Sequence, residues 1–317
     1  MRLAAPAPLS FRRAAGQNAG RTRRWPPPAP QGNSPVPDRK RFELLAVDLD
    51  GTLLDSQHRL PQRTRDALHG AHAAGLKIVL CTGRSYTETR PILQQIGLNL
   101  DAAVTVGGAL LSDLTTGRTL DCTPIAPHIA AAAATWLLRR GYTVMWLRDA
   151  SSAGFDGYLI AGPRRHPAID AWSAATPCEM RPIARLPDDG APPLRLTVVD
   201  DAEALRQVSA EFDRAFDGQL SHNVIGVPMY GFTVLEAFAA DVNKWSGIVK
   251  LCRRWGIDPR RTVAVGDDVN DLPMVRQAGL GVAVANARPD VRAVARRIVG
   301  SNDECGVAEL IDELLRQ

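Results

Sequence analysis

An apolar run that ends abruptly in two carboxylates constrains the fold more than any other feature of this chain. Leu44-Leu45-Ala46-Val47 has the uninterrupted apolar character of a buried strand, and Asp48 and Asp50 follow before Gly51-Thr52 breaks the pattern. Residues i and i+2 of a continuing strand share one face, so both acids are expected at its carboxyl end. Open α/β sheets bind their ligands at that end. The segment therefore predicts a strand that delivers two acids to a functional site.

A calcium loop and a solvated acidic turn are the alternatives for this segment. A calcium loop that began at Asp48 would need Gly at its sixth position and Glu at its twelfth, where this chain has Leu53 and Arg59. The solvated turn stays open on this segment alone. The decision therefore depends on partner motifs further along the chain.

Strands and helices alternate from Phe42 to the C-terminus. Strands are predicted over 44–49, 76–81, 102–106, 263–265, 281–284 and 297–299, with helices over 61–74 and 86–96. A second set, strands 143–147, 158–160 and 194–199 and helices 128–140 and 202–216, lies between these halves. The alternation predicts an α/β protein whose core is a doubly wound, Rossmann-like parallel sheet. We expect this core over 41–121 and 236–317, with a second α/β domain over 122–235 inserted into it.

Residues 1–40 differ in composition from the rest of the chain. They hold eight of the 23 prolines and seven Arg and one Lys against one Asp, and they show no apolar periodicity. This composition predicts a disordered, basic N-terminal extension. The remaining residues carry 30 basic and 33 acidic side chains, so the body of the protein gives no reason to expect a nucleic-acid surface.

The cysteines and the hydropathy indicate the compartment. The five cysteines are widely spaced and form no CxxC pair, a pattern that favours reduced thiols and a cytoplasmic protein. No apolar stretch of the sequence is long enough to cross a bilayer, so no membrane partner is expected.

A second strand followed by acids occurs late in the chain. Val263-Ala264-Val265 runs into Gly266 and then into three carboxylates within five residues, Asp267, Asp268 and Asp271. Carboxylates this close repel one another in a partly dehydrated cleft, and a hard divalent cation removes that repulsion. A donor set made only of oxygen atoms favours Mg²⁺, which is the cofactor we expect.

Two further segments have the chemistry of a phosphate site. Thr82-Gly83 follows the strand 76–81 and precedes a helix, so a hydroxyl and a free backbone N–H form a candidate anion cradle. Lys244 is one of only four lysines against 34 arginines, and a compact ammonium suits a transferring phosphoryl group. Each segment alone also fits a structural role, as a helix cap or as a surface charge.

With four motifs in this order, residues 42–317 resemble the haloacid dehalogenase-like (HAD) phosphohydrolases. The resemblance is to the Cof-type members, which carry a large α/β cap between the second and third motifs. Val284-Ala285-Asn286-Ala287 and the segment 301–307 also resemble that family. The resemblance implies a hydrolase, a phosphatase that acts on small phosphorylated metabolites such as sugar phosphates.

The resemblance also implies a role for each matching residue. Asp48 would be the nucleophile that forms an aspartyl-phosphate, and Asp50 would act as general acid and base, a role that needs a pKa raised toward neutrality. Thr82, Gly83, Lys244 and Asn270 would bind phosphate. Asp48, the backbone carbonyl of Asp50, Asp267 and Asp271 would form the metal site, with Asp271 orienting Lys244 or a metal-bound water.

Several points stay open at this stage. Gly107 stands where related enzymes often have Asn, which removes a polar side chain near the mouth of the cleft. A phosphosugar mutase of similar architecture is one alternative function. A non-catalytic anion-binding protein that uses its basic N-terminal arm is another. The sequence does not indicate an oligomeric state.

Overall fold

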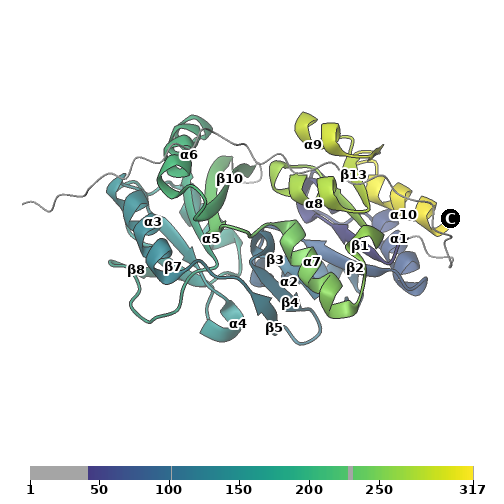
Figure 1. Cartoon of the computed structure of the whole chain (residues 1–317), viewed down its shortest axis with the longest axis horizontal. Coiled ribbons are helices and arrows are strands. Elements are labelled where there is room, and N and C mark those ends of the chain that lie inside the picture. The colour runs from purple at the N-terminus through teal and green to yellow at the C-terminus, as the bar shows by residue number, and fades with distance from the viewer. Residues whose placement is uncertain (1–41, 101, 228–230, 317) are drawn as a thin grey trace, which may run out of the picture. The chain divides into compact units, whose positions relative to one another are not determined.

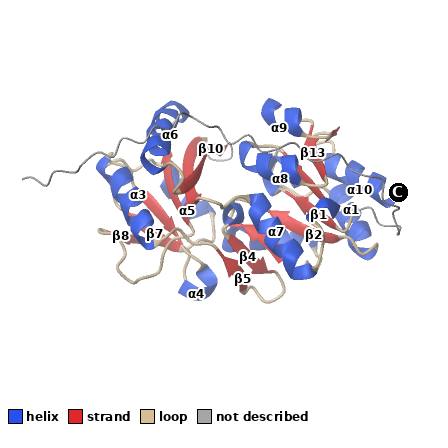
Figure 2. Cartoon of the chain, in the orientation of Figure 1, coloured by secondary structure: helices blue, strands red, loops and turns tan. Residues whose placement is uncertain are grey.

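A computed structural model of the chain describes residues 42–100, 102–227 and 231–316. These residues form two β-sheets with helices packed on them (Figures 1 and 2). The extension over 1–40, which the composition predicts to be disordered, lies outside the described residues. Among the described residues, we find no helix with the length and apolar character needed to cross a membrane.

The first sheet contains the strands predicted for the core. Its strands are β1 (Leu44–Val47), β2 (Lys77–Cys81), β3 (Ala102–Thr105), β4 (Leu110–Asp113), β5 (Thr119–Cys122), β12 (Thr262–Gly266), β13 (Leu280–Val284) and β14 (Arg297–Val299). Their order is β14-β13-β12-β1-β2-β3-β4-β5. Neighbours from β14 to β3 are parallel, whereas β4 and β5 extend the sheet as antiparallel strands. The predicted doubly wound parallel core is confirmed, with an antiparallel edge in addition.

The order in which the chain adds strands to this sheet reverses at β1. From β1 it passes through β2 to β3 on one side, and through β12 and β13 to β14 on the other. Val47 is the register partner of Val265, and the backbone N–H of Asp48 donates to the carbonyl oxygen of Val265 at 3.1 Å. A reversal of this kind opens a crevice at the carboxyl ends of the strands. The segments that follow β1 and β12 therefore meet at one edge of the sheet.

Helices cover this sheet and complete its core. They are α1 (Gln62–Ala73), α2 (Tyr86–Ile96), α7 (Lys244–Trp255), α8 (Leu272–Gln277), α9 (Pro289–Val294) and α10 (Gly306–Arg316). The helix α1 contacts α10, while α7 contacts α8 and the strands β2 to β4 (Figure 1). Leu45, Val79 and Val263 are fully buried beneath them, which explains why these strands read as continuous apolar runs.

The second sheet is formed by the inserted residues. Its strands are β6 (Val144–Leu147), β7 (Gly157–Ile160), β8 (Met180–Ile183), β9 (Arg195–Asp200), β10 (Leu220–Val227) and β11 (Phe232–Ala239), in the order β10-β11-β9-β6-β7-β8. Its helices are α3 (Pro127–Arg139), α4 (Ala150–Ala153), α5 (Ala168–Ala175) and α6 (Ala202–Phe216). Residues of α3 and α6, such as Leu137 and Phe212, share a buried cluster with Leu196 of β9. On the opposite face, Trp172 of α5 packs with Met145 of β6.

The strand β11 bears on the boundary predicted between the two domains. That boundary, between residues 235 and 236, falls inside β11, which pairs with β9 and β10 as part of the second sheet. The sequence pattern placed it too early because a hairpin strand lacks the strand–helix alternation on which the prediction relied. We therefore propose a cap domain that extends through Ala239 and a core that resumes at Ala240.

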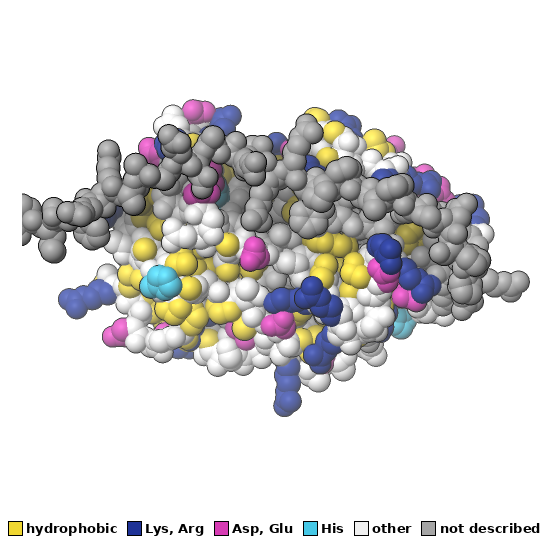
Figure 3. All heavy atoms as spheres, viewed as in Figure 1, with side chains coloured by type: hydrophobic (Ala, Val, Ile, Leu, Met, Phe, Trp, Pro, Cys, Tyr) yellow, Lys and Arg dark blue, Asp and Glu magenta, His cyan; other side chains and the backbone are white. Residues whose placement is uncertain are grey.

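Charged side chains are mixed on the face of the molecule shown in Figure 3. Lys and Arg side chains of the described residues lie next to Asp and Glu side chains there. Among the ion pairs of the described residues, Arg181 and Glu179 lie 2.7 Å apart, with both side chains about half exposed. Pairs of this kind contribute little to stability, since water and salt screen them.

Candidate active site

A buried lysine joins two of the predicted acids. Lys244 is 1% exposed, and its Nζ lies 2.5 Å from Oδ1 of Asp48 and 2.6 Å from Oδ1 of Asp271. The position of the lysine follows from local sequence, because Asn243 caps the helix α7 by accepting a hydrogen bond from the backbone N–H of Ser246. The cap fixes Lys244 as the first helical residue, directly at the carboxyl end of the sheet.

Three carboxylates gather around this lysine. Oxygen atoms of Asp48, Asp267 and Asp271 all lie within 4.8 Å of one another. Burial, followed by the negative charge of Asp271, raises the pKa of Asp48 well above its usual range and raises that of Asp267 to about 7. One ammonium group does not offset this crowding. A hard cation with oxygen ligands fits the site, and these three acids are the residues that would hold it.

The two acidic loops approach each other closely at Gly51. Thr52 donates from Oγ1 to Oδ1 of Asp267 at 2.7 Å. Gly51 has a φ of +79°, and a Cβ atom added there would lie 2.5 Å from Oδ2 of Asp267. Any side chain at this position would push Asp267 away from Asp48. The glycine that breaks the first motif is therefore what allows the acids of both loops to share one site.

Asp50 does not point into the carboxylate cluster. The strand ends at Val47 and the chain turns over Leu49–Leu53, so the expectation of a continuing strand that carries both acids on one face is wrong. The carboxylate of Asp50 instead accepts hydrogen bonds from Arg84, at 2.8 Å from Nε and 2.5 Å from Nη2, and lies 3.4 Å from Nδ1 of His58.

The surroundings of Asp50 set its ionisation. Burial alone would raise the pKa of Asp50, but the hydrogen bonds and charges of His58 and Arg84 hold it well below its usual range. The pKa raised toward neutrality that the sequence led us to expect is therefore wrong for this arrangement. The causes are His58 and Arg84, and the fork of donors of Arg84 matches both oxygens of the carboxylate. The predicted metal ligand of this residue, its backbone carbonyl, stays a prediction.

The predicted phosphate-binding residues also lie at this edge of the sheet. Thr82 is buried, and its Oγ1 accepts a hydrogen bond from the backbone N–H of Arg84 at 3.1 Å. A methyl group added to Gly83 would lie 4.0 Å from Nδ2 of Asn270, so these two residues face the same space. The structure thus brings together Thr82, Gly83 and Asn270 with the Lys244 cluster. Their roles in binding phosphate remain a proposal.

Asp271 supports the site in a second way. Its Oδ2 accepts hydrogen bonds from the backbone N–H groups of Asp267 and Asp268, at 3.0 and 3.1 Å. Its other oxygen contacts Lys244. Asp271 is fully buried, and it therefore links the loop after β12 to the lysine on α7.

Sequence reasoning missed several residues beside the site. Arg84 belongs to the Thr-Gly-Arg segment, but nothing in the sequence pairs it with Asp50, 34 positions away. Glu236 and Arg195 lie in the inserted domain and reach Gly83. Arg195 donates from Nη1 to its carbonyl oxygen at 2.7 Å, and Oε2 of Glu236 lies 3.9 Å from a methyl group added to it. Gly107, the departure noted in the sequence, has a φ of +62°, and a Cβ atom there would lie 2.9 Å from Cζ of Phe238. The phenyl ring occupies the space that a side chain at position 107 would take.

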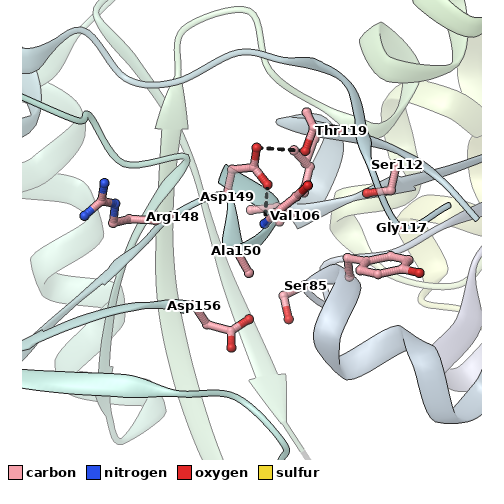
Figure 4. A pocket seen from close by; sticks show the side chains of 12 residues that line it. Ser85, Val106, Ser112, Gly117, Thr119, Arg148, Asp149, Ala150 and Asp156 are labelled. Atoms are coloured by element: carbon pink, nitrogen blue, oxygen red, sulfur yellow. Dashed lines mark hydrogen bonds between the residues drawn. The ribbon is translucent and has the colours of Figure 1, made fainter. Parts of the chain in front are cut away.

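A small cavity lies near this site, where α2 and β4 meet residues 148–156 (Figure 4). Ser85, Ser112 and Asp156 line it, and at its edge Thr119 donates from Oγ1 to Oδ2 of Asp149 at 2.7 Å. Its volume of about 10 Å³ suits a single water molecule. The cavity is too small to be the binding site of a phosphorylated metabolite.

Comparisons with known proteins agree with this geometry. Residues 45–311 match the family model of the haloacid dehalogenase-like hydrolases. The chain is 27% identical over 296 residues to 5-amino-6-(5-phospho-D-ribitylamino)uracil phosphatase YwtE of Bacillus subtilis, covering 86% of this chain and 98% of that protein. It is 27% identical over 287 residues to pyridoxal phosphate phosphatase YbhA of Escherichia coli, covering 84% and 97%.

Solved structures show the same fold. A haloacid dehalogenase-like hydrolase from B. subtilis superposes with a TM-score of 0.72 at 24% identity, over 86% of this chain and all of that one. The resemblance to Cof-type phosphohydrolases that the motifs indicated is confirmed. The chain therefore belongs to the haloacid dehalogenase-like hydrolase family, and the predicted enzyme class, a phosphoric monoester hydrolase, is confirmed.

Proposed function

We propose that this protein is a Mg²⁺-dependent phosphatase that hydrolyses small phosphomonoesters, sugar phosphates or related metabolites, through an aspartyl-phosphate on Asp48. One observation carries the proposal: the Nζ of Lys244 lies between Asp48 and Asp271, with Asp267 beside them, at the carboxyl edge of a parallel sheet. The named relatives act on a phosphorylated pyrimidine and on pyridoxal phosphate, which supports small phosphorylated metabolites as the substrate class.

The first chemical step forms a bond between an oxygen of Asp48 and phosphorus. The bond from phosphorus to the leaving oxygen breaks in line, and the leaving oxygen takes a proton from the general acid, which we assign to Asp50. Lys244 orients Asp48 and favours its carboxylate form, whereas burial and the charge of Asp271 oppose it. Mg²⁺, when bound by Asp48, Asp267 and Asp271, would neutralise negative charge on the phosphoryl group.

The second step removes the phosphoryl group from the enzyme. A water molecule attacks phosphorus, its proton passes to Asp50, and the bond from phosphorus to Asp48 breaks to release inorganic phosphate. Thr82 and the backbone N–H of Gly83 would hold phosphoryl oxygens during both steps. Two easier displacements thus replace one difficult hydrolysis.

Asp50 can serve this role only after it exchanges partners. Both of its oxygens are occupied by Arg84. We therefore propose that substrate binding draws Arg84 away to the phosphomonoester. The pKa of Asp50 then rises, Asp50 takes up a proton from solvent, and it gives this proton to the leaving oxygen. Arg84 is suited to this exchange because the same donor fork fits carboxylate and phosphate oxygens.

The location of the enzyme is part of the proposal. All five cysteines are described, and all are free thiols. Unpaired cysteines are typical of reducing compartments. We therefore place the enzyme in the cytoplasm.

The experiment that tests the function is hydrolysis of p-nitrophenyl phosphate by the purified full-length protein. We expect turnover with Mg²⁺ that is lost in excess EDTA and recovers when Mg²⁺ is restored. Folding is checked in each condition by circular dichroism. Folded protein that shows no turnover at any metal concentration would contradict the proposal.

A further inference from the structure

The small cavity of Figure 4 lies where the core meets the inserted domain, and we call it the junction cavity. The core contributes the hydroxyls of Ser85, the N-cap of α2, and Ser112 of β4 to its lining. The inserted domain contributes the carboxylates of Asp149 and Asp156. Ser85, Ser112 and Asp156 are 4%, 2% and 4% exposed. The junction cavity is therefore a buried polar space between two domains.

Asp156 has one carboxylate oxygen that is hydrogen-bonded and one that is not. Its Oδ2 accepts from the backbone N–H of Glu179 at 2.9 Å. Its Oδ1 is buried and has no hydrogen-bond partner within the described part of the chain. Figure 4 shows this carboxylate turned toward Ser85. A buried carboxylate loses its water at a large cost unless a cation or hydrogen-bond donors compensate for it. The unpaired oxygen therefore indicates a ligand in the cavity.

The arginine that lines the cavity does not supply this compensation. Arg148 donates from Nη1 to Oδ2 of Asp189 at 2.6 Å and to the hydroxyl of Tyr158 at 3.3 Å. In Figure 4 its guanidinium group points away from Asp156. The positive charge of Arg148 is therefore paired outside the cavity.

The second carboxylate of the cavity adds negative charge. Asp149 accepts from Oγ1 of Thr119 and from the backbone N–H of Ser151, one bond on each of its oxygens. These neutral donors leave its charge in place. Among the described residues, no ion pair joins a Lys or Arg to Asp149, and the same holds for Asp156. The junction cavity therefore attracts a cation.

The size and the donors of the cavity indicate which kind of cation it holds. Its volume of about 10 Å³ has room for one water-sized particle. Mg²⁺ keeps several water molecules in its shell, and these do not fit. K⁺ has nearly the radius of a water molecule, and its single charge matches the one carboxylate oxygen that lacks a partner. Ser85 accepts one hydrogen bond, from the backbone N–H of Glu88, so its oxygen retains a lone pair for a cation.

We propose that the junction cavity binds a monovalent cation of the size of K⁺, with Oδ1 of Asp156 and the hydroxyl oxygens of Ser85 and Ser112 as its ligands. The cation links the core to the inserted domain, because its ligands come from both. It is separate from the carboxylate cluster around Lys244, and its binding requires neither Mg²⁺ nor substrate.

Thermal unfolding of the full-length protein in EDTA tests the proposal. KCl is compared with tetramethylammonium chloride at equal ionic strength, because tetramethylammonium is too large for the cavity. We expect Tm to be higher in KCl by about 3–6 °C, the shift expected at roughly ten times the Kd of a ligand that binds only the folded state. No catalysis takes place in this measurement, so its result does not depend on the proposed phosphatase function.

A substitution at the cavity assigns the effect to Asp156. Asp156→Asn removes the charge at nearly constant volume and should abolish the difference in Tm between the two salts. Asp170→Asn is the matched control, because Asp170 lies on α5 of the same domain with an exposed side chain paired with Arg165. It should keep the difference. A K⁺ bound at the carboxylate cluster instead would leave the difference intact in Asp156→Asn.

The position of the cation is tested by a method that needs no variant. Crystals of the wild-type protein are soaked in a thallium(I) salt, because Tl⁺ is close to K⁺ in size and scatters X-rays anomalously. We expect an anomalous peak in the junction cavity, beside Oδ1 of Asp156. Three results would overturn the proposal: equal Tm of the wild type in the two salts, a folded Asp156→Asn that keeps the K⁺ effect, or a cavity without an anomalous peak.

Discussion

Lys244 lies between two buried carboxylates, Asp48 and Asp271, and reduces their mutual repulsion. Burial disfavours the charged ammonium, but Asp271 and Asp48 together raise the pKa of Lys244 above its usual value. Lys244→Met leaves both acids without this partner. We expect kcat with p-nitrophenyl phosphate to fall at least 100-fold, which is the size of effect expected when one charged group is removed from a reaction centre. We also expect the free energy of unfolding, measured by urea denaturation, to fall by about 3–5 kcal/mol.

A second lysine on the same helix provides the control for this variant. Lys250 contacts Asp121 and Thr123, and its side chain is 34% exposed. Lys250→Met should change stability by less than about 1 kcal/mol and leave turnover as in the wild type. Equal effects of the two lysine variants would show that the burial of Lys244 between carboxylates has no special role.

Gly51 allows a second prediction at the scale of one residue. Gly51→Ala and Gly97→Ala both place a methyl group on a residue in the left-handed region, at φ values of +79° and +68°. Each should cost about 1–2 kcal/mol of stability in urea denaturation. Only the methyl at Gly51 meets Asp267, whereas that at Gly97 meets nothing within 4 Å. Turnover should therefore be lost in Gly51→Ala alone, and comparable turnover in the two variants would contradict the close approach of the acidic loops.

The helix α2 allows a prediction at the scale of one element. Its capping box joins Ser85 and Glu88, with each side chain bonded to the backbone N–H of the other. The other oxygen of Glu88 accepts from Nε1 of Trp172 in the inserted domain at 3.1 Å. Glu88→Ala should lower the free energy of unfolding, measured by urea denaturation, by about 1–2 kcal/mol, because it removes both the cap and the hydrogen bond to the indole. Asp66→Ala on α1, where Gln62 is the hydrogen-bond partner, is the control, and equal losses would exclude a structural role for the capping box.

At the same scale, the sequence predicted those elements that local chemistry determines. The helices 86–96 and 202–216 and the strand 297–299 match the observed bounds, because caps, glycines and apolar runs mark them. It missed β5 and β10, whose side chains are largely half-buried or exposed. Such strands depend on pairing with neighbours distant in the chain, which no short window of residues records.

The part of the site that the sequence could not predict depends on the whole molecule, because it lies where the inserted sheet meets the core. Asp48, Lys244, Asp267 and Asp271 follow strands or begin helices at one sheet edge, so topology brings them together as predicted. The contact between Arg195 and Gly83 joins β9 of the second sheet to the loop that follows β2 of the first, across 112 positions of the sequence. Its existence depends on how the inserted sheet meets the core, and no motif encodes that geometry.

Metal binding should couple to the stability of the whole protein. Without metal, burial and Asp271 raise the pKa of Asp267 from 3.8 to about 7. Between these values the folded state binds more protons than the unfolded one, so its stability falls as pH rises from about 4 to about 7. Bound Mg²⁺ would replace those protons, and at 100 times its Kd it should add about 2.7 kcal/mol to the free energy of unfolding.

Differential scanning calorimetry checks this coupling. The increase in Tm produced by Mg²⁺ over EDTA should be larger at pH 8 than at pH 5, since at pH 5 protons compete for the same oxygens. In Asp267→Asn the increase should be small at both values. An increase in Tm that is equal at pH 5 and pH 8 in the wild type would contradict a metal held by this carboxylate cluster.

Chemical trapping tests whether Asp48 accepts the phosphoryl group. The enzyme is mixed with p-nitrophenyl phosphate and Mg²⁺, quenched in acid within one turnover, digested, and analysed by mass spectrometry. We expect one added phosphoryl group on the peptide that contains Asp48, absent without Mg²⁺ and absent in Asp48→Asn. A phosphoryl group on another residue, or none while the wild type turns over rapidly, would contradict it.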